Sequence, residues 1–265
     1  ALGTLSTSSI AGSLLGPMIG GYIAENSGLQ NVFFITGALM VIAFITTALF
    51  VKEAFNRQDK KVLSTKEVWN TIPNKSLIAI MFVTSFILTL ALFSIEPIIT
   101  VYVTQISINT SHVALLSGMT FSASGLASII AAPRLGKLSD KVGPHKVMLA
   151  SLIVAGIIFI PQAFVRNPWE LMILRFVLGL ATAGLVPSVN SLVKKITPSS
   201  LTGRVFGLNM AAQYLGVFGG SILGGQVAAY MGIRYVFFIT SALLLINAFW
   251  VYNKVSTKVA ESICF

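Results

Sequence analysis

The stretch GTLSTSSIAGSLLGPMIGG at residues 3–21 decides the fold, because it returns in outline 204 positions later as GLNMAAQYLGVFGGSILGG at residues 207–225. Both copies continue into the pentapeptide VFFIT, and fifteen of forty positions are identical between residues 3–42 and 207–246, without a gap. A fixed internal period is the sequence sign of a repeated architecture. The repeated unit is hydrophobic throughout, so we interpret it as a repeat of membrane helices, which is how many transporters are built.

The composition of the whole chain points the same way. It is 55% hydrophobic and 10% charged, with a mean hydropathy of +0.87, whereas a soluble domain carries about 25% charged residues. Apolar runs near 20 residues recur, each long enough to cross roughly 30 Å of hydrocarbon. We predict an all-α membrane protein with eight spans, at about residues 3–24, 32–51, 77–103, 113–133, 147–165, 171–193, 205–229 and 235–252.

The net charge of +10 could indicate a nucleic-acid partner, but its distribution argues against one. Fifteen of the eighteen basic residues fall on alternate connections and on the C-terminal tail. These basic segments are residues 52–76, 134–146, 194–204 and 254–265. Cytoplasmic loops of membrane proteins carry an excess of Lys and Arg. We therefore expect the four segments to face the cytoplasm from a multi-pass protein of the plasma membrane, with the lipid bilayer and no nucleic acid as a partner.

The repeat predicts how many helices belong together. Six predicted spans separate the starts of the two copies, which is 204 residues or 34 per span. The second copy closes the chain, so the glycine-rich pair is the last pair of each six-helix half. We therefore expect eight helices of a twelve-helix protein: residues 1–51 as the last two helices of the N-terminal half, 52–76 as a cytoplasmic linker, 77–253 as the C-terminal half and 254–265 as a cytoplasmic tail. Within the linker, Ser64-x-x-Glu67 fits a capping box that begins a short surface helix, although a solvated linker is an equal alternative.

The glycines of the first copy are regularly spaced. Gly12, Gly16 and Gly20 recur every four residues and form a bare strip that lets a neighbouring backbone approach closely. Pro17 removes one backbone donor and bends the helix. Tight packing alone would explain the strip. The full frame is more specific, because it resembles the antiporter signature G-x8-G-x3-GP-x2-GG of the major facilitator superfamily. The matching positions are Gly3, Gly12, Gly16, Pro17, Gly20 and Gly21.

This resemblance implies a fold and an activity. In the superfamily's drug/proton antiporters the signature lies in the fifth helix, which agrees with the count above. The second copy has Ser221 in place of the proline, as expected of the degenerate partner in helix eleven. The implied protein is a helical bundle of the major facilitator type that exports small drug-like molecules, lipophilic or cationic, in exchange for protons, and that is a monomer when full length.

A second motif follows the fourth predicted span. The segment 136–146 reads GKLSDKVGPHK and resembles the superfamily's loop motif G-x-L-x-D-R/K-x-G-x-x-K/R. The resemblance implies a cytoplasmic gate formed by Gly136, Asp140, Lys141, Gly143 and Lys146. A carboxylate near a helix N-terminus is favoured by about 0.3–1 kcal/mol, which would suit Asp140. The alternative is a tight turn with positive anchors, which needs only the glycine and the lysines.

Glu96 is the one carboxylate deep within a predicted span. Ionisable residues in such places are costly and usually face a cavity. Ser85, Thr89, Glu96 and Thr100 are spaced by 4, 7 and 4 residues, which places them on one helix face. Burial disfavours a charged carboxylate, so protonation near neutral pH is within reach. Glu96 also resembles the helix-seven carboxylate of Gram-positive multidrug pumps, and we predict that it couples protons. The alternative is a hydrated position near the outer interface.

Other polar side chains are candidates to line a substrate cavity. They are Thr89, Phe93, Thr100, Arg175, Asn209 and Gln213. Arg175 shares a helix face with Gly179 and Thr182, but snorkelling to the outer headgroups would equally explain it. Asn209 and Gln213 share a face with Gly216, so helix packing competes with substrate contact. Phe93 could contribute to an apolar wall or face lipid.

Missing motifs narrow the function further. The sequence has no G-x4-GK[ST] phosphate loop and no His/Cys cluster for a metal, so we expect no cofactor, no metal and no enzymatic activity. The energy would come from an ion gradient. Alternatives are an exporter of another small molecule such as a sugar or siderophore, a proton symporter, a non-transporting membrane scaffold or sensor, or an inactive product of a truncated gene.

Overall fold

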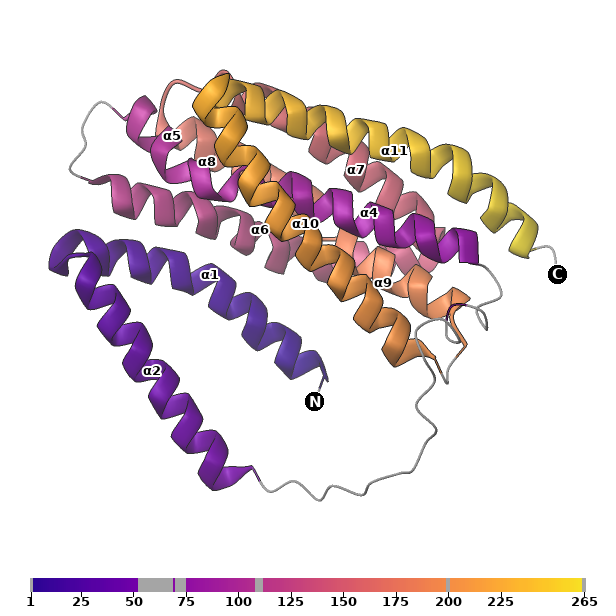
Figure 1. The fold of residues 1–265 in the computed structure, drawn as a ribbon, viewed down its shortest axis with the longest axis horizontal. Helices are drawn as coiled ribbons and strands as arrows, with labels where there is room; N and C mark the ends of the chain where they lie inside the picture. Colours follow the sequence, from indigo (N-terminus) through magenta and orange to yellow (C-terminus); the bar gives the residue numbers. More distant parts are fainter. Residues whose placement is uncertain (1, 52–68, 70–74, 108–111, 199–200, 264–265) are drawn as a thin grey trace.

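The computed structural model describes residues 2–51, 69, 75–107, 112–198 and 201–263, and this part of the chain is helical with no β-strand (Figure 1). The helices are α1 (Leu2–Ser27), α2 (Leu29–Phe50), α4 (Lys75–Phe93), η1 (Glu96–Ile98), α5 (Ile99–Ile106), α6 (Val113–Val142), α7 (Pro144–Gln162), α8 (Pro168–Thr182), α9 (Leu185–Ile196), α10 (Thr202–Tyr230) and α11 (Ile233–Ile263). The surface helix expected after Ser64 lies outside the described residues.

Each predicted span corresponds to one helix or to one interrupted pair of helices. Six segments of the described chain are long and apolar enough to cross a membrane. They are Leu29–Phe50, Lys75–Ile106, Val113–Val142, Pro144–Gln162, Pro168–Ile196 and Ile233–Lys254. The other two predicted spans are α1 and α10, with 26 and 29 residues. Both are long enough to span the hydrocarbon, but their many glycines lower the average hydropathy.

Two of the spans are interrupted, and a proline accounts for each interruption. Proline lacks the N–H that would bond the carbonyl four residues earlier. Phe93 is four residues before Pro97, and α4 ends at Phe93. Ala183 is four residues before Pro187, and it follows the end of α8. The first interruption places Glu96 at the start of the short helix η1 rather than within a continuous helix.

The two copies of the sequence repeat have the same local structure. Gly28 joins α1 to α2 with a φ of 85°, and Gly232 joins α10 to α11 with a φ of 102°. These positive values favour glycine, because a β-carbon is strained there. The helices that follow begin at Leu29 and Ile233, which are again 204 positions apart. The repeat is therefore a repeat of one helical hairpin.

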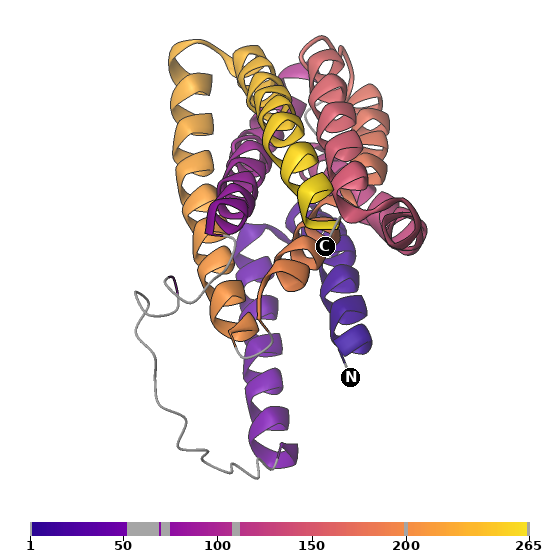
Figure 2. The same ribbon diagram turned by 90° about the vertical axis from the view of Figure 1, so that its right-hand side faces the viewer.

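The hydrophobic core lies within residues 77–251. There α10 packs along α4, α11 packs along α7, and α8 packs along α6. From the first hairpin, α1 lies against α6, whereas α2 diverges from the bundle and has no buried residue (Figures 1 and 2). The hairpin α1–α2 is thus attached to the rest of the described chain chiefly through α1.

Candidate functional site

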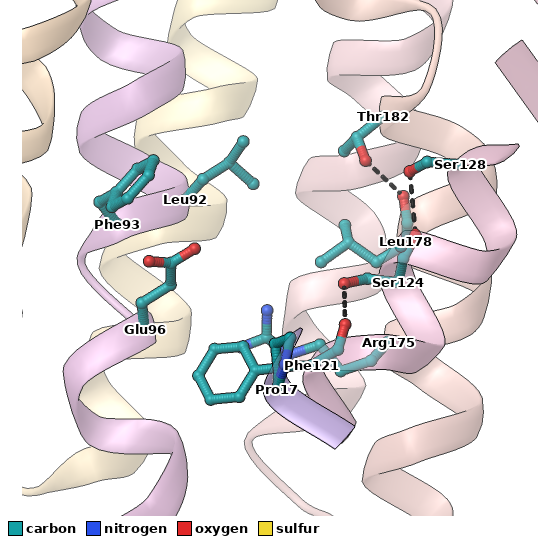
Figure 3. A pocket seen from close by; sticks show the side chains of 11 residues that line it. Pro17, Leu92, Phe93, Glu96, Phe121, Ser124, Ser128, Arg175, Leu178 and Thr182 are labelled. Carbon is teal, nitrogen blue, oxygen red and sulfur yellow. Dashed lines mark hydrogen bonds between the residues drawn. The ribbon is translucent and has the colours of Figure 1, made fainter. Parts of the chain in front are cut away.

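A cavity of about 590 Å³ lies between α1, the α4–η1 break, α6 and α8 (Figure 3). Its volume is within the range of roughly 300–1,000 Å³ usual for small-molecule sites. The residues that line it are Pro17, Leu92, Phe93, Glu96, Phe121, Ser124, Gly125, Ser128, Arg175, Leu178 and Thr182. The lining is mostly apolar, and Glu96 and Arg175 are the charged side chains in it.

Glu96 reaches the cavity because the helix breaks beside it. The residue opens η1, with Pro97 directly after it, and its side chain is exposed rather than packed in the core. Figure 3 shows its carboxylate directed into the cavity from the α4 side. A carboxylate in this position is open to water and to a bound molecule, so it can exchange a proton or attract a cation.

Arg175 borders the cavity from α8, on the side opposite Glu96 (Figure 3). The side chain is only 6% exposed. One turn later, Gly179 lets α8 approach α6 so closely that a β-carbon there would come within 3.0 Å of Ser124. Nε and Nη2 of Arg175 are buried and have no hydrogen-bond partner. Tight packing of two helices therefore holds a guanidinium with unpaired donors at the cavity wall.

The hydroxyl groups of the cavity are engaged with the backbone. Ser124 donates to the carbonyl of Phe121 at 2.8 Å, and Ser128 donates to the carbonyl of Ser124 at 2.9 Å. Thr182 donates to the carbonyl of Leu178 at 3.0 Å. Each hydroxyl proton is thus directed at a backbone carbonyl of its own helix, and Ser128 also lies 3.3 Å from the Gly179 carbonyl of α8. What remains for a bound molecule is the hydroxyl oxygens as acceptors and the two charged groups.

The wall contributed by α1 is held by close backbone contact with α6. A β-carbon on Gly118 would come within 3.0 Å of the Pro17 carbonyl oxygen. Ser122 donates to the Leu14 carbonyl at 2.6 Å. Nearer the end of α1, Glu25 Oε1 pairs with Nδ1 of His112. The contact runs from Leu14 to Glu25, and it places Pro17 at the edge of the cavity.

A comparison with protein families now identifies this architecture. The family model described as Major Facilitator Superfamily matches residues 1–121 and again residues 81–262. The chain belongs to the major facilitator superfamily. The predicted family and the predicted all-α membrane fold are confirmed, and the chain is a multi-pass membrane protein of this superfamily.

Curated relatives in the superfamily are similar over almost the whole chain. It is 40% identical over 259 residues to the Multidrug resistance protein MdtG of Salmonella arizonae, 41% identical to that of Salmonella schwarzengrund and 40% identical to that of Citrobacter koseri. Each match covers 97% of this chain and 64% of the relative. The chain thus spans somewhat less than two thirds of the length of these relatives.

Within this superfamily fold, the predicted site residues fall into two groups. Glu96, Phe93 and Arg175 meet at the cavity, together with Pro17 of the antiporter motif. The remaining substrate candidates, Thr89, Thr100, Asn209 and Gln213, do not line it. The polar stripe expected from Ser85 to Thr100 assumed an unbroken helix, but the break at Glu96 puts Thr100 on the separate helix α5.

The four residues outside the cavity have other surroundings. Thr89 donates to the Gln213 carbonyl at 2.9 Å, in the interface of α4 with α10. Asn209 is fully buried, and neither of its amide atoms has a hydrogen-bond partner. Thr100 is exposed. A role for these residues in substrate contact stays a prediction, and packing is what the structure assigns to Thr89.

The two glycine strips of the superfamily repeat differ in what they contact. In α10, a β-carbon on Gly216 or Gly220 would come within 3.0 Å of α4, and one on Gly224 would come within 3.0 Å of Ser94, which directly follows α4. In α1, Gly12 and Gly16 have nothing within 4 Å of that position, and Gly20 has only Val32 at 4.0 Å. The strip in α10 is therefore a packing surface for α4, whereas in the α1 strip only Gly20 reaches a described neighbour, Val32 of α2.

The gate motif is mostly helical. Gly136, Asp140 and Lys141 lie in the last turns of α6, Gly143 alone makes the turn with a φ of 97°, and Lys146 lies in α7. Asp140 is exposed near the C-terminal end of α6, so the expected stabilisation at a helix N-terminus does not apply to it. No ion pair in the described part of the chain involves Asp140. Its gate role stays a prediction.

Sequence reasoning did not single out the α6 wall of the cavity. Phe121, Ser124, Gly125 and Ser128 all come from this helix. A signal was present, because small residues recur at Gly118, Ser122 and Gly125 with helical spacing. Such a strip indicates a helix face that another helix approaches closely, and here that helix is α1.

Proposed function

We propose that the complete protein is a secondary active transporter that exports lipophilic or cationic drug-like molecules in exchange for protons. The observation that carries the proposal is the placement of Glu96, a carboxylate at a helix break that borders a drug-sized cavity among apolar helices. Charged groups inside membrane helices commonly mark proton or substrate pathways. The relatives named as multidrug resistance proteins support the substrate class.

The proposed cycle uses the charge of Glu96 directly. Ionised Glu96 attracts a cationic drug into the cavity, where Leu92, Phe93 and Phe121 receive the apolar part. Protonation from the outside neutralises the carboxylate and weakens its attraction for the drug, which is released. Exchange of one proton for one monovalent cationic drug moves no net charge, so the pH difference drives it, and each pH unit supplies about 1.4 kcal/mol, enough for a roughly tenfold drug gradient.

Alternating access requires the cavity to open to each side in turn. We propose that the contact between α1 and α6 separates and re-forms during this cycle, because these helices belong to different predicted halves. We propose that the basic segments 52–76, 134–146, 194–204 and 254–265 face the cytoplasm, so the far end of α1, near Glu25, would lie on the outer side of the plasma membrane. Protons would then enter from the Glu25 side. We also propose that the complete carrier is a monomer.

Replacement of Glu96 by glutamine tests this proposal. The complete protein encoded by the gene is placed in proteoliposomes, and extrusion of the cationic dye rhodamine 123 is followed under a pH gradient. We expect Glu96→Gln to abolish gradient-driven extrusion, Glu96→Asp to keep part of it, and Glu170→Gln, which changes an exposed carboxylate outside the cavity, to leave it intact. Unchanged extrusion by Glu96→Gln would refute the assignment.

A further inference from the structure

The cavity contains two opposite charges on opposite walls that do not neutralise each other by contact. Glu96 enters from η1 and Arg175 from α8 (Figure 3). Both side chains line the cavity, but no ion pair joins them. The cavity is therefore a dipolar site with one negative and one positive wall.

The positive wall lacks an acceptor. Nε and Nη2 of Arg175 are buried and have no hydrogen-bond partner. Only 6% of this residue is exposed. A buried donor left without a partner is expensive, and a charged one more so. The hydroxyls of Ser124, Ser128 and Thr182 in the cavity lining donate their protons to backbone carbonyls. Arg175 borders the cavity, so a bound molecule can supply an acceptor to its guanidinium.

A lipophilic cation without a carboxylate would leave the guanidinium of Arg175 without an acceptor. It would pair with Glu96, but it would bring a second positive charge towards Arg175 and supply no acceptor for the guanidinium. A ligand with both charges satisfies both walls. Its net charge of zero also matches a cavity in which one carboxylate and one guanidinium are ionised.

We propose that the preferred ligand of this cavity is a zwitterionic amphiphile, with its basic group at Glu96, its carboxylate at Arg175 and an apolar ring system between them. The inference deepens the proposed export function and rests on it. Arg175 is then a specificity-determining residue: its planar guanidinium can bind a carboxylate through two parallel hydrogen bonds. Leu92, Phe93, Phe121 and Leu178 supply the apolar surface that holds the ring system.

Two dyes that differ in one carboxylate test the contribution of that group to binding. Rhodamine 110 carries a free carboxylate beside its cationic ring system, and rhodamine 123 is the methyl ester of the same dye. Binding of each dye to the complete purified protein is measured by fluorescence anisotropy near neutral pH. We expect rhodamine 110 to bind about tenfold more tightly than rhodamine 123, because a hydrogen bond to a charged group is worth about a decade of affinity or more.

Variants assign the preference to one residue. Arg175→Gln should remove the preference for rhodamine 110 while rhodamine 123 still binds, which also shows that the variant is folded. Arg175→Lys should restore part of the preference, since it keeps the charge but loses the paired geometry. Arg166→Gln, which removes an exposed arginine outside the cavity, should leave the preference unchanged.

The outcomes separate this inference from the export function. Equal affinity for the two dyes in the unmodified protein, or a preference that survives in Arg175→Gln, overturns the zwitterion proposal, and proton-driven extrusion of rhodamine 123 would then still support export. A preference that depends on Arg175 without any proton-driven extrusion supports the ligand class and contradicts the export function. Failure of both dyes to bind contradicts both.

Discussion

Gly118 of α6 lies against the backbone of Pro17 of α1, so closely that a β-carbon on Gly118 would come within 3.0 Å of the Pro17 carbonyl oxygen. Pro17 also borders the cavity. The contact thus joins the antiporter motif to the wall of the proposed substrate site. Because α1 and α6 belong to different predicted halves, the same contact would have to separate whenever the cavity opens towards the Glu25 end.

Replacement of Gly118 by valine should disrupt this contact. Two methyl groups cannot be accommodated against a backbone carbonyl, and overpacking of this kind costs about 1–3 kcal/mol. We expect a lower melting temperature of the purified protein and at least a severalfold loss of dye extrusion. Gly37→Val is the control, because nothing lies within 4 Å of a β-carbon at Gly37. Equal behaviour of the two variants would show that α1 does not pack on α6 in this way.

The glycine strip of α10 provides an internally controlled stability test. Gly220→Ala places a methyl group against the backbone of Leu90 in α4, and Gly224→Ala places one against the backbone of Ser94 just after α4, whereas Gly225 has open space at the same position. We expect the first two variants to destabilise the protein by about 1–3 kcal/mol and Gly225→Ala to have little effect. The measurement is thermal unfolding in detergent. A destabilised Gly225→Ala, or a stable Gly224→Ala, would contradict the helix pairing.

The pair formed by Glu25 and His112 links α1 to α6 near the end of α1. Glu25 is the more buried partner, with 17% of its side chain exposed against 63% for His112. We expect Glu25→Gln and His112→Gln to be non-additive, with a coupling energy of about 0.2–1 kcal/mol as for partly exposed ion pairs. A double-mutant cycle on thermal stability measures it. Strictly additive effects would mean that the pair contributes nothing to the contact between the helices.

Pro97 should keep the helix open at Glu96. Pro97→Ala restores a backbone N–H that can bond the Phe93 carbonyl, so residues 94–98 should become more helical. We expect slower amide hydrogen exchange in this segment and reduced dye extrusion, because Glu96 would be turned relative to the cavity. Pro187→Ala is the matched change at the second interruption. Unaltered exchange at residues 94–98 would show that the proline does not cause the break.

Much of this arrangement could be predicted from the sequence. The period of 204 residues and the apolar runs predicted the helices, and Pro97 predicted a disturbance beside Glu96. Local sequence influences such features, because a proline cannot donate the backbone hydrogen bond of a continuous helix. Pro17, Pro133 and Pro161 nevertheless lie inside α1, α6 and α7, so a proline alone does not fix where a helix ends. Glu96, Phe93 and Arg175 could be named as cavity candidates because charged and aromatic side chains stand out in an apolar span.

The features that could not be predicted from the sequence depend on which helices contact one another. Gly16 and Gly220 occupy equivalent positions in the repeat, yet only Gly220 has a helix against it, and no local pattern distinguishes them. The same reason explains why Thr89 was expected in the cavity but lies against Gln213. Ser124 and Ser128 gave little signal, because serine in a helix usually bonds its own backbone, as both do here.

The proposed transport cycle requires that the cavity beside Glu96 meets water from each side of the membrane in turn. Phe93→Cys, in the complete protein with every native cysteine, Cys264 included, replaced by serine, reports this directly through labelling with a membrane-impermeant thiol reagent applied from one side at a time. We predict that the cysteine is labelled from the cytoplasmic side at rest and from the outer side under an inward proton gradient, and that bound drug slows both reactions. Labelling that is confined to one side under all conditions, or absent from both, would contradict the account.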